Sequence, residues 1–269
     1  MNMDHVSPSA LGMATRCMVQ YYFAYVQKIK MPPGVAMLKG SSVHDGRRAN
    51  LKQKIGTGQD LAVADVQDAT RDSMVARFSG DVQFDPEDKA GTPKRQMADS
   101  IDAVTHVAAR DYEVYQVPTV PKVVEQGLKA TIPGYDTVLL GYVDLIDQAD
   151  VLRDLKTVWS GRSPAISAAD NSLQLTAYDL LARANGLSVS GLQLEYLIPQ
   201  KKGIKTMELS TTRTRGQHEA LLRRLAVLLE AVRREVFVPA EVDSWMCSPR
   251  FCGYADQCPY YHGQKRPKS

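Results

Sequence analysis

The sequence lacks any long apolar run, and no stretch approaches the roughly 18 consecutive apolar residues that a membrane-spanning helix needs. Its start, Met1-Asn2-Met3-Asp4-His5, lacks the basic flank and apolar stretch of a secretion signal. We therefore expect a cytoplasmic location. Internal repeats and low-complexity tracts are also absent, as is the Gly-x-x-x-x-Gly-Lys-Ser/Thr signature, which excludes a P-loop ATPase within this chain.

The chain also lacks a strong charge of either sign. Lys and Arg number 33 against 30 Asp and Glu, a formal net charge of +3. A nucleic-acid partner would therefore have to be met by a local basic patch. With 44% hydrophobic and 23% charged residues, the composition excludes a disordered chain, and 269 residues suffice for a sizeable core. Four cysteines in this length exclude a small disulfide-stapled scaffold.

Local signals divide the chain, which we interpret as one domain, into four parts. Ser7 and Pro8 are typical of a helix start, and we expect a first helix to about Ile29, followed by a break at Met31-Pro32-Pro33-Gly34. The predicted parts are N-terminal helices at 7–54, a helical insertion at 56–120 with weak helical patterns around 61–78 and 95–112, a core at 122–236, and a cysteine-rich tail at 237–269.

The core part alternates strand and helix signals. A helix is predicted at Ser167–Asn185, which ends at Gly186, and a long Leu-rich helix follows around Leu221–Leu229. The pattern predicts an α/β fold, with a central mixed β-sheet flanked by helices. The predicted strands are Val123–Ile132, Val138–Ile146, Val151–Val158, Val189–Ile198 and Ile204–Leu209.

The second and third predicted strands form an acidic hairpin with two possible registers. Side chains alternate faces along a strand, so Asp154 and Lys156 project together. A two-residue loop at positions 148 and 149 pairs Asp144 with Arg153 and sends Asp154 to the other face. A three-residue loop at positions 148 to 150 pairs Asp144 directly with Asp154. The second register alone brings both carboxylates and the lysine together.

In that register the two carboxylates would lie ~5 Å apart at Cβ and repel each other unless something compensates. Mg²⁺ or Mn²⁺ fits such oxygen ligands and would polarise a phosphate and acidify water, while Lys156 orients the nucleophile or stabilises developing charge. These parts suit phosphodiester hydrolysis. The alternative is a solvent-facing hairpin end with a surface salt bridge.

Motifs in order along the chain give the hairpin a family context. Asp144, the Asp154-x-Lys156 element and the Gln174-x-x-x-Tyr178 helix resemble the RecB-like exonuclease branch of the PD-(D/E)XK nuclease superfamily. Gln174 and Tyr178 share one helix face, where they could contact the substrate strand or the lysine. The sequence departs from the superfamily name, because Val143 stands where Pro precedes the first acid and position 154 is Asp.

The resemblance implies a restriction-endonuclease-like core and a Mg²⁺- or Mn²⁺-dependent DNA exonuclease, with any helicase on a separate partner chain. It implies a metal site of His44, in the Gly40-x-x-x-His44 element, together with Asp144 and Asp154. Glu125 is a further candidate ligand, because a two-residue turn at Gly134-Tyr135 would place it opposite Asp144.

The cysteines indicate a second, separate metal site. Cys247, Cys252 and Cys258 lie close in sequence in the tail, and Cys17 is far from them. This pattern resembles the iron-sulfur members of the same nuclease branch, AddB-type proteins among them, which implies a structural 4Fe-4S cluster. The same tail with His262 also fits a three-Cys, one-His zinc module. We expect the iron-sulfur cluster.

Basic residues gather in three places where DNA phosphates could bind, although most charge runs are merely solvated faces. The alternative class of function is a non-catalytic RNA- or DNA-binding protein with a zinc module and a fortuitous acidic hairpin. The basic residues are Lys201, Lys202 and Lys205, then Arg213, Arg215, Arg223 and Arg224, then Lys265, Arg266 and Lys268.

Overall fold

A computed structural model describes residues 3–84, 91–241, 244–249 and 251–261. The chain divides into two compact units. The terminal unit comprises Met1–Met31, Lys129–Gly141 and Thr214–Ser269, and the sheet unit comprises Pro32–Leu128 and Tyr142–Arg213. None of the described helices is both long and apolar enough to cross a membrane.

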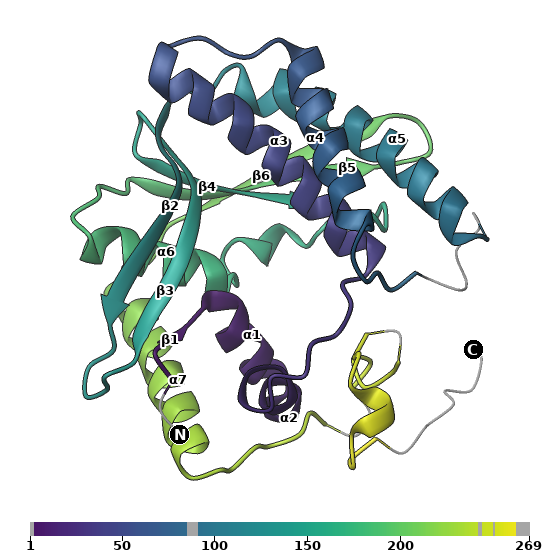
Figure 1. The fold of residues 1–269 in the computed structure, drawn as a ribbon. Coiled ribbons are helices and arrows are strands. Elements are labelled where there is room, and N and C mark those ends of the chain that lie inside the picture. The colour runs from purple at the N-terminus through teal and green to yellow at the C-terminus, as the bar shows by residue number, and fades with distance from the viewer. Residues whose placement is uncertain (1–2, 85–90, 242–243, 250, 262–269) are drawn as a thin grey trace. The chain divides into compact units, whose positions relative to one another are not determined.

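The central sheet is mixed (Figure 1). In the sheet unit, β3 pairs antiparallel with β4, β4 parallel with β5, and β5 antiparallel with β6, while β2 pairs with β3. The parallel pair needs a crossover connection, which the helix α6 (Leu173–Ala184) supplies. The strands are β2 (Pro121–Thr131), β3 (Val138–Asp147), β4 (Val151–Thr157), β5 (Gly191–Pro199) and β6 (Ile204–Thr211).

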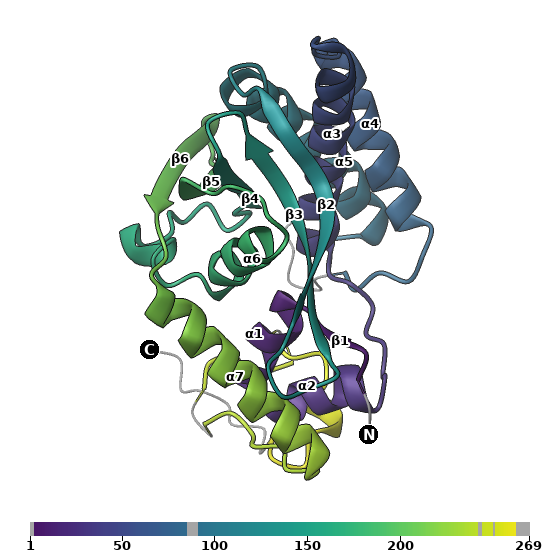
Figure 2. The ribbon, with the colours of Figure 1, turned by 90° about the vertical axis from the view of Figure 1, so that its left-hand side faces the viewer.

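Helices cover both faces of β4 and β5 in the sheet unit (Figure 2). The helices α3 (Val35–Thr57), α4 (Val63–Phe78) and α5 (Pro93–Asp111), with the π-helical segment η2 (Tyr112–Gln116), bury apolar side chains against Leu155 and Leu197. α3 and α4 approach so closely that a Cβ at Gly46 would lie 1.9 Å from Thr70 Oγ1. α6 lies on the other face, after a 3₁₀ turn at Ile166–Ala168.

The terminal unit is built from both ends of the chain. The short strand β1 (His5–Val6) pairs parallel with β3 at Val138 and Leu139. The tail adds a 3₁₀ turn, η4 (Ala255–Gln257), and Tyr254 packs with Val19 and Phe23. The helices of this unit are α1 (Pro8–Arg16), α2 (Met18–Tyr21), the π-helical η1 (Tyr22–Val26) and α7 (Arg215–Arg233).

The first helix differs from the prediction of one continuous helix to about Ile29. Cys17 is extended, with φ −160° and ψ 111°, and separates α1 from α2. Its Sγ accepts a hydrogen bond from Gln20 N at 3.4 Å, so Cys17 acts as the N-cap of α2. The break turns the thiol away from a regular helical position.

The mixed α/β fold is confirmed, and the predicted strands all occur, with no end shifted by more than two residues. α6 begins later than predicted, because Ser172 caps it by accepting from Leu175 N at 3.1 Å. The segment 56–120, predicted as a helical insertion, contains α4 and α5, whose side chains form part of the core of the sheet unit.

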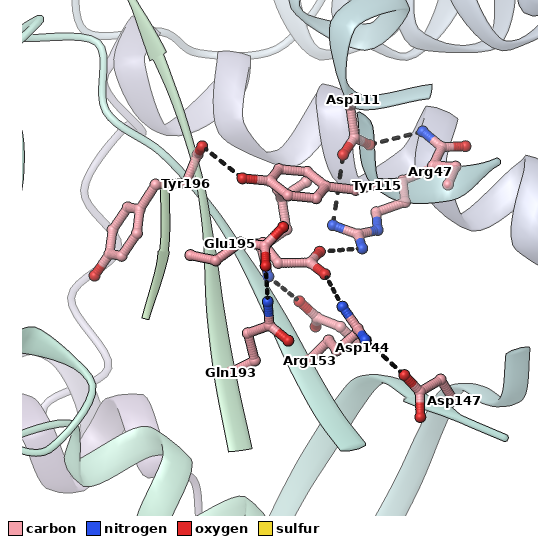
Figure 3. A network of polar contacts seen from close by, with 12 residues as sticks. Arg47, Asp111, Tyr115, Asp144, Asp147, Arg153, Gln193, Glu195 and Tyr196 are labelled. Carbon is pink, nitrogen blue, oxygen red and sulfur yellow. Dashed lines mark hydrogen bonds and ion pairs between the residues drawn. The ribbon is translucent and has the colours of Figure 1, made fainter. Parts of the chain in front are cut away.

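A network of buried ions fills the sheet face that α3 and α5 cover (Figure 3). Arg47 of α3 pairs with Glu195 of β5, and its NH1 lies 3.5 Å from Asp111 Oδ1. Arg153 of β4 donates to Glu195 at 2.9 Å and to Asp147 at 2.8 Å. Each carboxylate therefore faces at least one guanidinium, which compensates the cost of removing these charges from water.

We expect Arg47→Ala to lower the free energy of unfolding by about 3–5 kcal/mol, because it leaves Glu195 and Asp111 buried with too little positive charge. Urea unfolding followed by circular dichroism measures this change. The matched control is Arg215→Ala, which removes an exposed pair with Glu219 and should change stability by less than about 0.5 kcal/mol. Equal effects of the two substitutions would contradict a structural role of the network.

Candidate active site

The β3–β4 hairpin has the three-residue loop, one of the two arrangements that the sequence allows. Leu145 pairs with Arg153 and Ile146 with Leu152, so extending this register by one residue sets Asp144 opposite Asp154. Asp150 closes the loop with φ +60°, the left-handed conformation that commonly ends a three-residue hairpin loop. Asp147 Oδ1 accepts from the N–H groups of Ala149 and Val151 and fixes the turn.

Beside the acidic pair, a side chain of β3 accepts a hydrogen bond from the backbone of β4. The N–H of Leu155 points to the side chain of Asp144, with 3.4 Å between Leu155 N and Asp144 Oδ2. His44 of α3 lies at the same place, with Nε2 3.0 Å from Leu155 O and Nδ1 3.4 Å from Asp144 Oδ2. The backbone of β4 thus orients both a carboxylate and an imidazole.

The contacts of His44 define its tautomer. A carbonyl oxygen accepts only, so Nε2 must carry the hydrogen that it donates to Leu155 O. In the neutral ring, Nδ1 then presents a lone pair toward the carboxylate of Asp144. Two lone pairs facing each other repel, and a cation bound by both groups would remove that repulsion.

Glu125 completes a group of three potential metal ligands. One ligand atom from each of His44, Glu125 and Asp144 lies within 4.8 Å of the other two. Burial is the main cause that raises the pKa of Glu125, and the neighbouring Asp144 raises it further, whereas Arg48 and His44 oppose the shift. Glu125 therefore approaches Asp144 as predicted, but the predicted two-residue turn at Gly134 and Tyr135 is wrong, because the turn closes around Pro133 and Gly134, with Tyr135 N donating to Ile132 O at 3.0 Å.

Glu125 reaches this position through a strained backbone. Its φ is +49°, in the left-handed region that residues with a Cβ seldom occupy. The buried positions of β2 change there from odd numbers, Pro121 and Val123, to an even one, Leu128. Such a shift is typical of a β-bulge, which redirects a side chain. The strain therefore serves to aim the carboxylate at the group of ligands.

Asp154 lies outside that group of three and pairs with the lysine instead. Its side chain is 1% exposed, and Oδ2 lies 2.6 Å from Lys156 Nζ. Within the described residues, neither of its oxygens makes a well-aligned hydrogen bond. Burial raises the pKa of Asp154, Lys156 opposes this, and Asp144 adds to it. A buried carboxylate with so few donors can accept another cation or water.

A short chain of hydrogen bonds connects Lys156 to α6. Lys156 Nζ donates to Gln174 Oε1 at 2.8 Å, and Gln174 Nε2 donates to Tyr178 OH at 2.8 Å. Burial alone would lower the pKa of Lys156, but Asp154 and Asp144 raise it above its ordinary value. The lysine is therefore held as a cation with its direction fixed by α6 and Asp154.

The start of α6 is itself anchored by an arginine. Arg213 donates through Nε to Thr176 Oγ1 at 2.7 Å and through NH2 to Ala169 O and Ser172 O at 2.6 and 3.1 Å. Its guanidinium is thus engaged in holding the residues before Gln174. The basic pattern of the sequence suggested Arg213 as a phosphate contact, but these bonds give it a structural task.

The four cysteines come together in the terminal unit. They line one cavity together with Phe23 and Tyr254. Burial raises the pKa of Cys252, and the nearby thiols of Cys17, Cys258 and Cys247 add to the shift. The break at Cys17 and the tail turns thus bring distant thiols to one place. His262, Lys265, Arg266 and Lys268 lie outside the described residues.

Comparison with protein families matches residues 5–259 to the PD-(D/E)XK nuclease superfamily. The chain therefore belongs to the PD-(D/E)XK nuclease superfamily. The fold and the acidic site agree with this class, whose members act on nucleic acids and use divalent metals. A search of curated proteins found no match.

Comparison with solved structures supports the fold. A protein of Eubacterium rectale described as "Putative exonuclease" matches with a TM-score of 0.51 and 14% identity, covering 99% of this chain and 91% of that one. The structure named SSO0001 has a TM-score of 0.37 and 14% identity, with 93% and 94% coverage. The first similarity shows a shared fold, whereas the second is too weak to show one.

The strain at Glu125 predicts an inverted order of two substitutions. Glu125→Gly should be more stable than Glu125→Ala by about 1 kcal/mol, because glycine tolerates the positive φ and alanine does not. In the same strand, Lys122→Gly should be less stable than Lys122→Ala by about 0.5–1 kcal/mol, the ordinary order. Urea midpoints of the four variants measure both differences. A less stable Gly variant at position 125 would show that the backbone there is unstrained.

Proposed function

We propose that this chain is a divalent-metal-dependent DNA exonuclease of the RecB-like branch. The observation that carries the proposal is the convergence of His44, Glu125 and Asp144 beside the Asp154–Lys156 pair. Three carboxylates with a histidine and a lysine, drawn from three strands and a helix, have little use as surface salt bridges, because two of them are made less acidic by burial.

The donors fit a hard divalent cation. Carboxylate oxygens are the ligands that Mg²⁺ and Mn²⁺ prefer, and an imidazole nitrogen adds to the affinity for Mn²⁺. His44 and Asp144 face each other with lone pairs, and Asp154 keeps oxygens available. When bound, the cation would supply charge stabilisation at the phosphate and acidify a water molecule. Asp154 remains a proposed ligand, because its carboxylate lies near Asp144 and His44.

Lys156 is the group assigned to the reacting atoms. An ammonium has three hydrogens; Lys156 donates one to Gln174 and forms an ion pair with Asp154, which leaves at least one hydrogen for water or a phosphate oxygen. In hydrolysis the water oxygen bonds to phosphorus and the bond to the leaving oxygen breaks. Lys156 stabilises the negative charge that grows on the phosphate. Gln174 acts as a positioning residue, and Tyr178 orients Gln174.

We also propose a structural 4Fe-4S cluster held by Cys17, Cys247, Cys252 and Cys258. A single tetrahedral Zn²⁺ with bonds of about 2.3 Å requires sulfurs that lie about 4 Å apart. Across the described part of the chain, the group at His44 is the only set of three potential ligands found within 4.8 Å, and it contains no cysteine. All four thiols line one cavity, which supports a cluster of several metal ions with four cysteine ligands.

DNA as substrate and cleavage from an end rest on the motif resemblance. The Eubacterium rectale protein that shares the fold bears an exonuclease description, which supports the same activity here. Phosphate contacts could come from Lys201, Lys202 and the exposed Arg223 and Arg224. Because the chain lacks a P-loop signature, a helicase that opens duplex ends would be a separate partner.

The nuclease proposal predicts metal-dependent loss of end-labelled linear DNA. Wild type should degrade it in Mg²⁺ or Mn²⁺ and not in EDTA. Asp154→Ala and Lys156→Ala should each lose at least about 10²- to 10³-fold in rate, because each removes charge from the reacting centre. Asp72→Ala, which removes an exposed carboxylate of α4, is the matched control and should retain the wild-type rate.

Closed circular single-stranded DNA in the same assay separates end-dependent from internal cleavage. An exonuclease leaves the circle intact, whereas degradation of the circle would replace the exonuclease assignment with an endonuclease. Inactive wild type, with equal DNA binding by folded wild type and variants, would favour the non-catalytic nucleic-acid-binding alternative.

For the cluster, protein purified without oxygen should be brown and contain iron, because thiolate-bound iron-sulfur clusters absorb visible light. Cys17→Ala should bleach the colour, and His262→Ala should leave it unchanged. Absorption spectra and metal analysis measure both. Colourless protein with one zinc per chain, retained in Cys17→Ala and lost in His262→Ala, would establish the three-Cys, one-His zinc module instead.

A further inference from the structure

Tyr142 is an exposed aromatic residue on the strand that carries Asp144. The burial pattern of β3 alternates there, with Gly141 and Val143 buried and Tyr142 and Asp144 toward the open face. Tyr142 is 59% exposed, although a large aromatic ring would be more stable if covered. Residues two apart in a strand lie about 7 Å from each other, so the ring stands next to the acidic site.

One side of the ring is supported by a glycine of the neighbouring strand. A Cβ built at Gly127 of β2 would lie 3.0, 3.4 and 3.6 Å from Cε1, Cδ1 and Cζ of Tyr142. Three consecutive ring atoms at similar distances indicate that the face of the ring, rather than its edge, covers the glycine. Gly127 follows Glu125 by two residues in β2, and Tyr142 precedes Asp144 by two residues in β3. The ring and the glycine that supports it therefore lie on the two strands that carry Glu125 and Asp144.

We propose that the exposed face of Tyr142 is a stacking platform for one unpaired nucleobase of the DNA strand whose phosphate occupies the acidic site. This inference rests on the proposed function and names a subsite within it. A base is flat and stacks on an aromatic face without requiring sequence-specific hydrogen bonds. The ring is supported on one side, open on the other, and lies within reach of a nucleotide bound at Asp144.

The platform favours an unpaired end over an intact duplex. Bases inside a duplex already stack on both faces, so a protein ring gains contact only with a base that has left the stack. Base–aromatic stacking is sequence-tolerant, so the platform sets no requirement on the identity of the base. The substrate class is therefore a single-stranded terminus or a frayed duplex end.

The experiment measures binding of a fluorescent single-stranded oligonucleotide to the full chain. Titrations are done in Ca²⁺, and the oligonucleotide is checked to be intact after each one. Tyr142→Ala should raise Kd about 5- to 150-fold, and Tyr142→Phe should bind like wild type because it keeps the ring. Gly127→Ala should also weaken binding, since its added Cβ displaces the ring. Tyr25→Ala, at a partly exposed tyrosine of the terminal unit, is the matched control.

A single abasic nucleotide, moved along the oligonucleotide, tests for the base itself. One position near an end should weaken binding to wild type and leave binding to Tyr142→Ala unchanged, since the interaction is then already lost. Equal weakening of both proteins at every abasic position would overturn the platform, as would wild-type affinity in Tyr142→Ala. Wild type that binds no single-stranded DNA would overturn it as well.

Cleavage by wild type in Mn²⁺, measured in parallel, separates this inference from the proposed nuclease activity. A wild type that cleaves DNA while Tyr142→Ala binds and cleaves equally well disproves the platform alone. A wild type that never cleaves disproves the enzyme, whatever the binding results are.

Discussion

The acidic site brings like charges close together, and the surrounding residues must hold them there. Burial raises the pKa of Glu125 and of Asp154, and the neighbouring carboxylate of Asp144 raises both further. Lys156 and a half-buried His44 offset part of this repulsion. The fold must therefore hold side chains together that would separate if free, and a divalent cation is the natural remaining compensation.

Strand β4 carries charged residues on both faces of the sheet. Asp154 and Lys156 point toward α6, while Arg153 lies on the other face, in the buried network with Glu195. A shift of β4 by one residue would exchange the two faces and bury the wrong charges on each. The buried ions behind the strand thus specify its register, and the register is what sets Asp154 opposite Asp144.

Much of this arrangement could be predicted from sequence because it depends on short-range rules. Strand alternation placed Asp154 with Lys156, helical spacing placed Gln174 with Tyr178, and the hairpin allowed only two registers. The backbone conformation of Glu125 was beyond prediction, because a bulge at a glutamate carries none of the glycine signal that marks a left-handed residue.

The break at Cys17 and the buried ion network were harder to predict from the sequence. The sequence around Cys17 suits a continuous helix, and the break there follows from packing and from the role of its Sγ as a cap. The pairing of Arg47 with Glu195 joins residues 148 positions apart, and no local pattern connects them. Both features depend on tertiary contacts, which propensity and periodicity do not report.

The costs in this fold are concentrated where the proposed chemistry takes place. Glu125 has a strained φ, Asp154 is buried with few donors, and the large ring of Tyr142 is left open to solvent. The strain and the buried carboxylate weaken the protein by themselves, and a ligand would complete each feature: a cation for the carboxylates, a base for the ring. The strained and exposed residues are therefore better explained by binding than by folding.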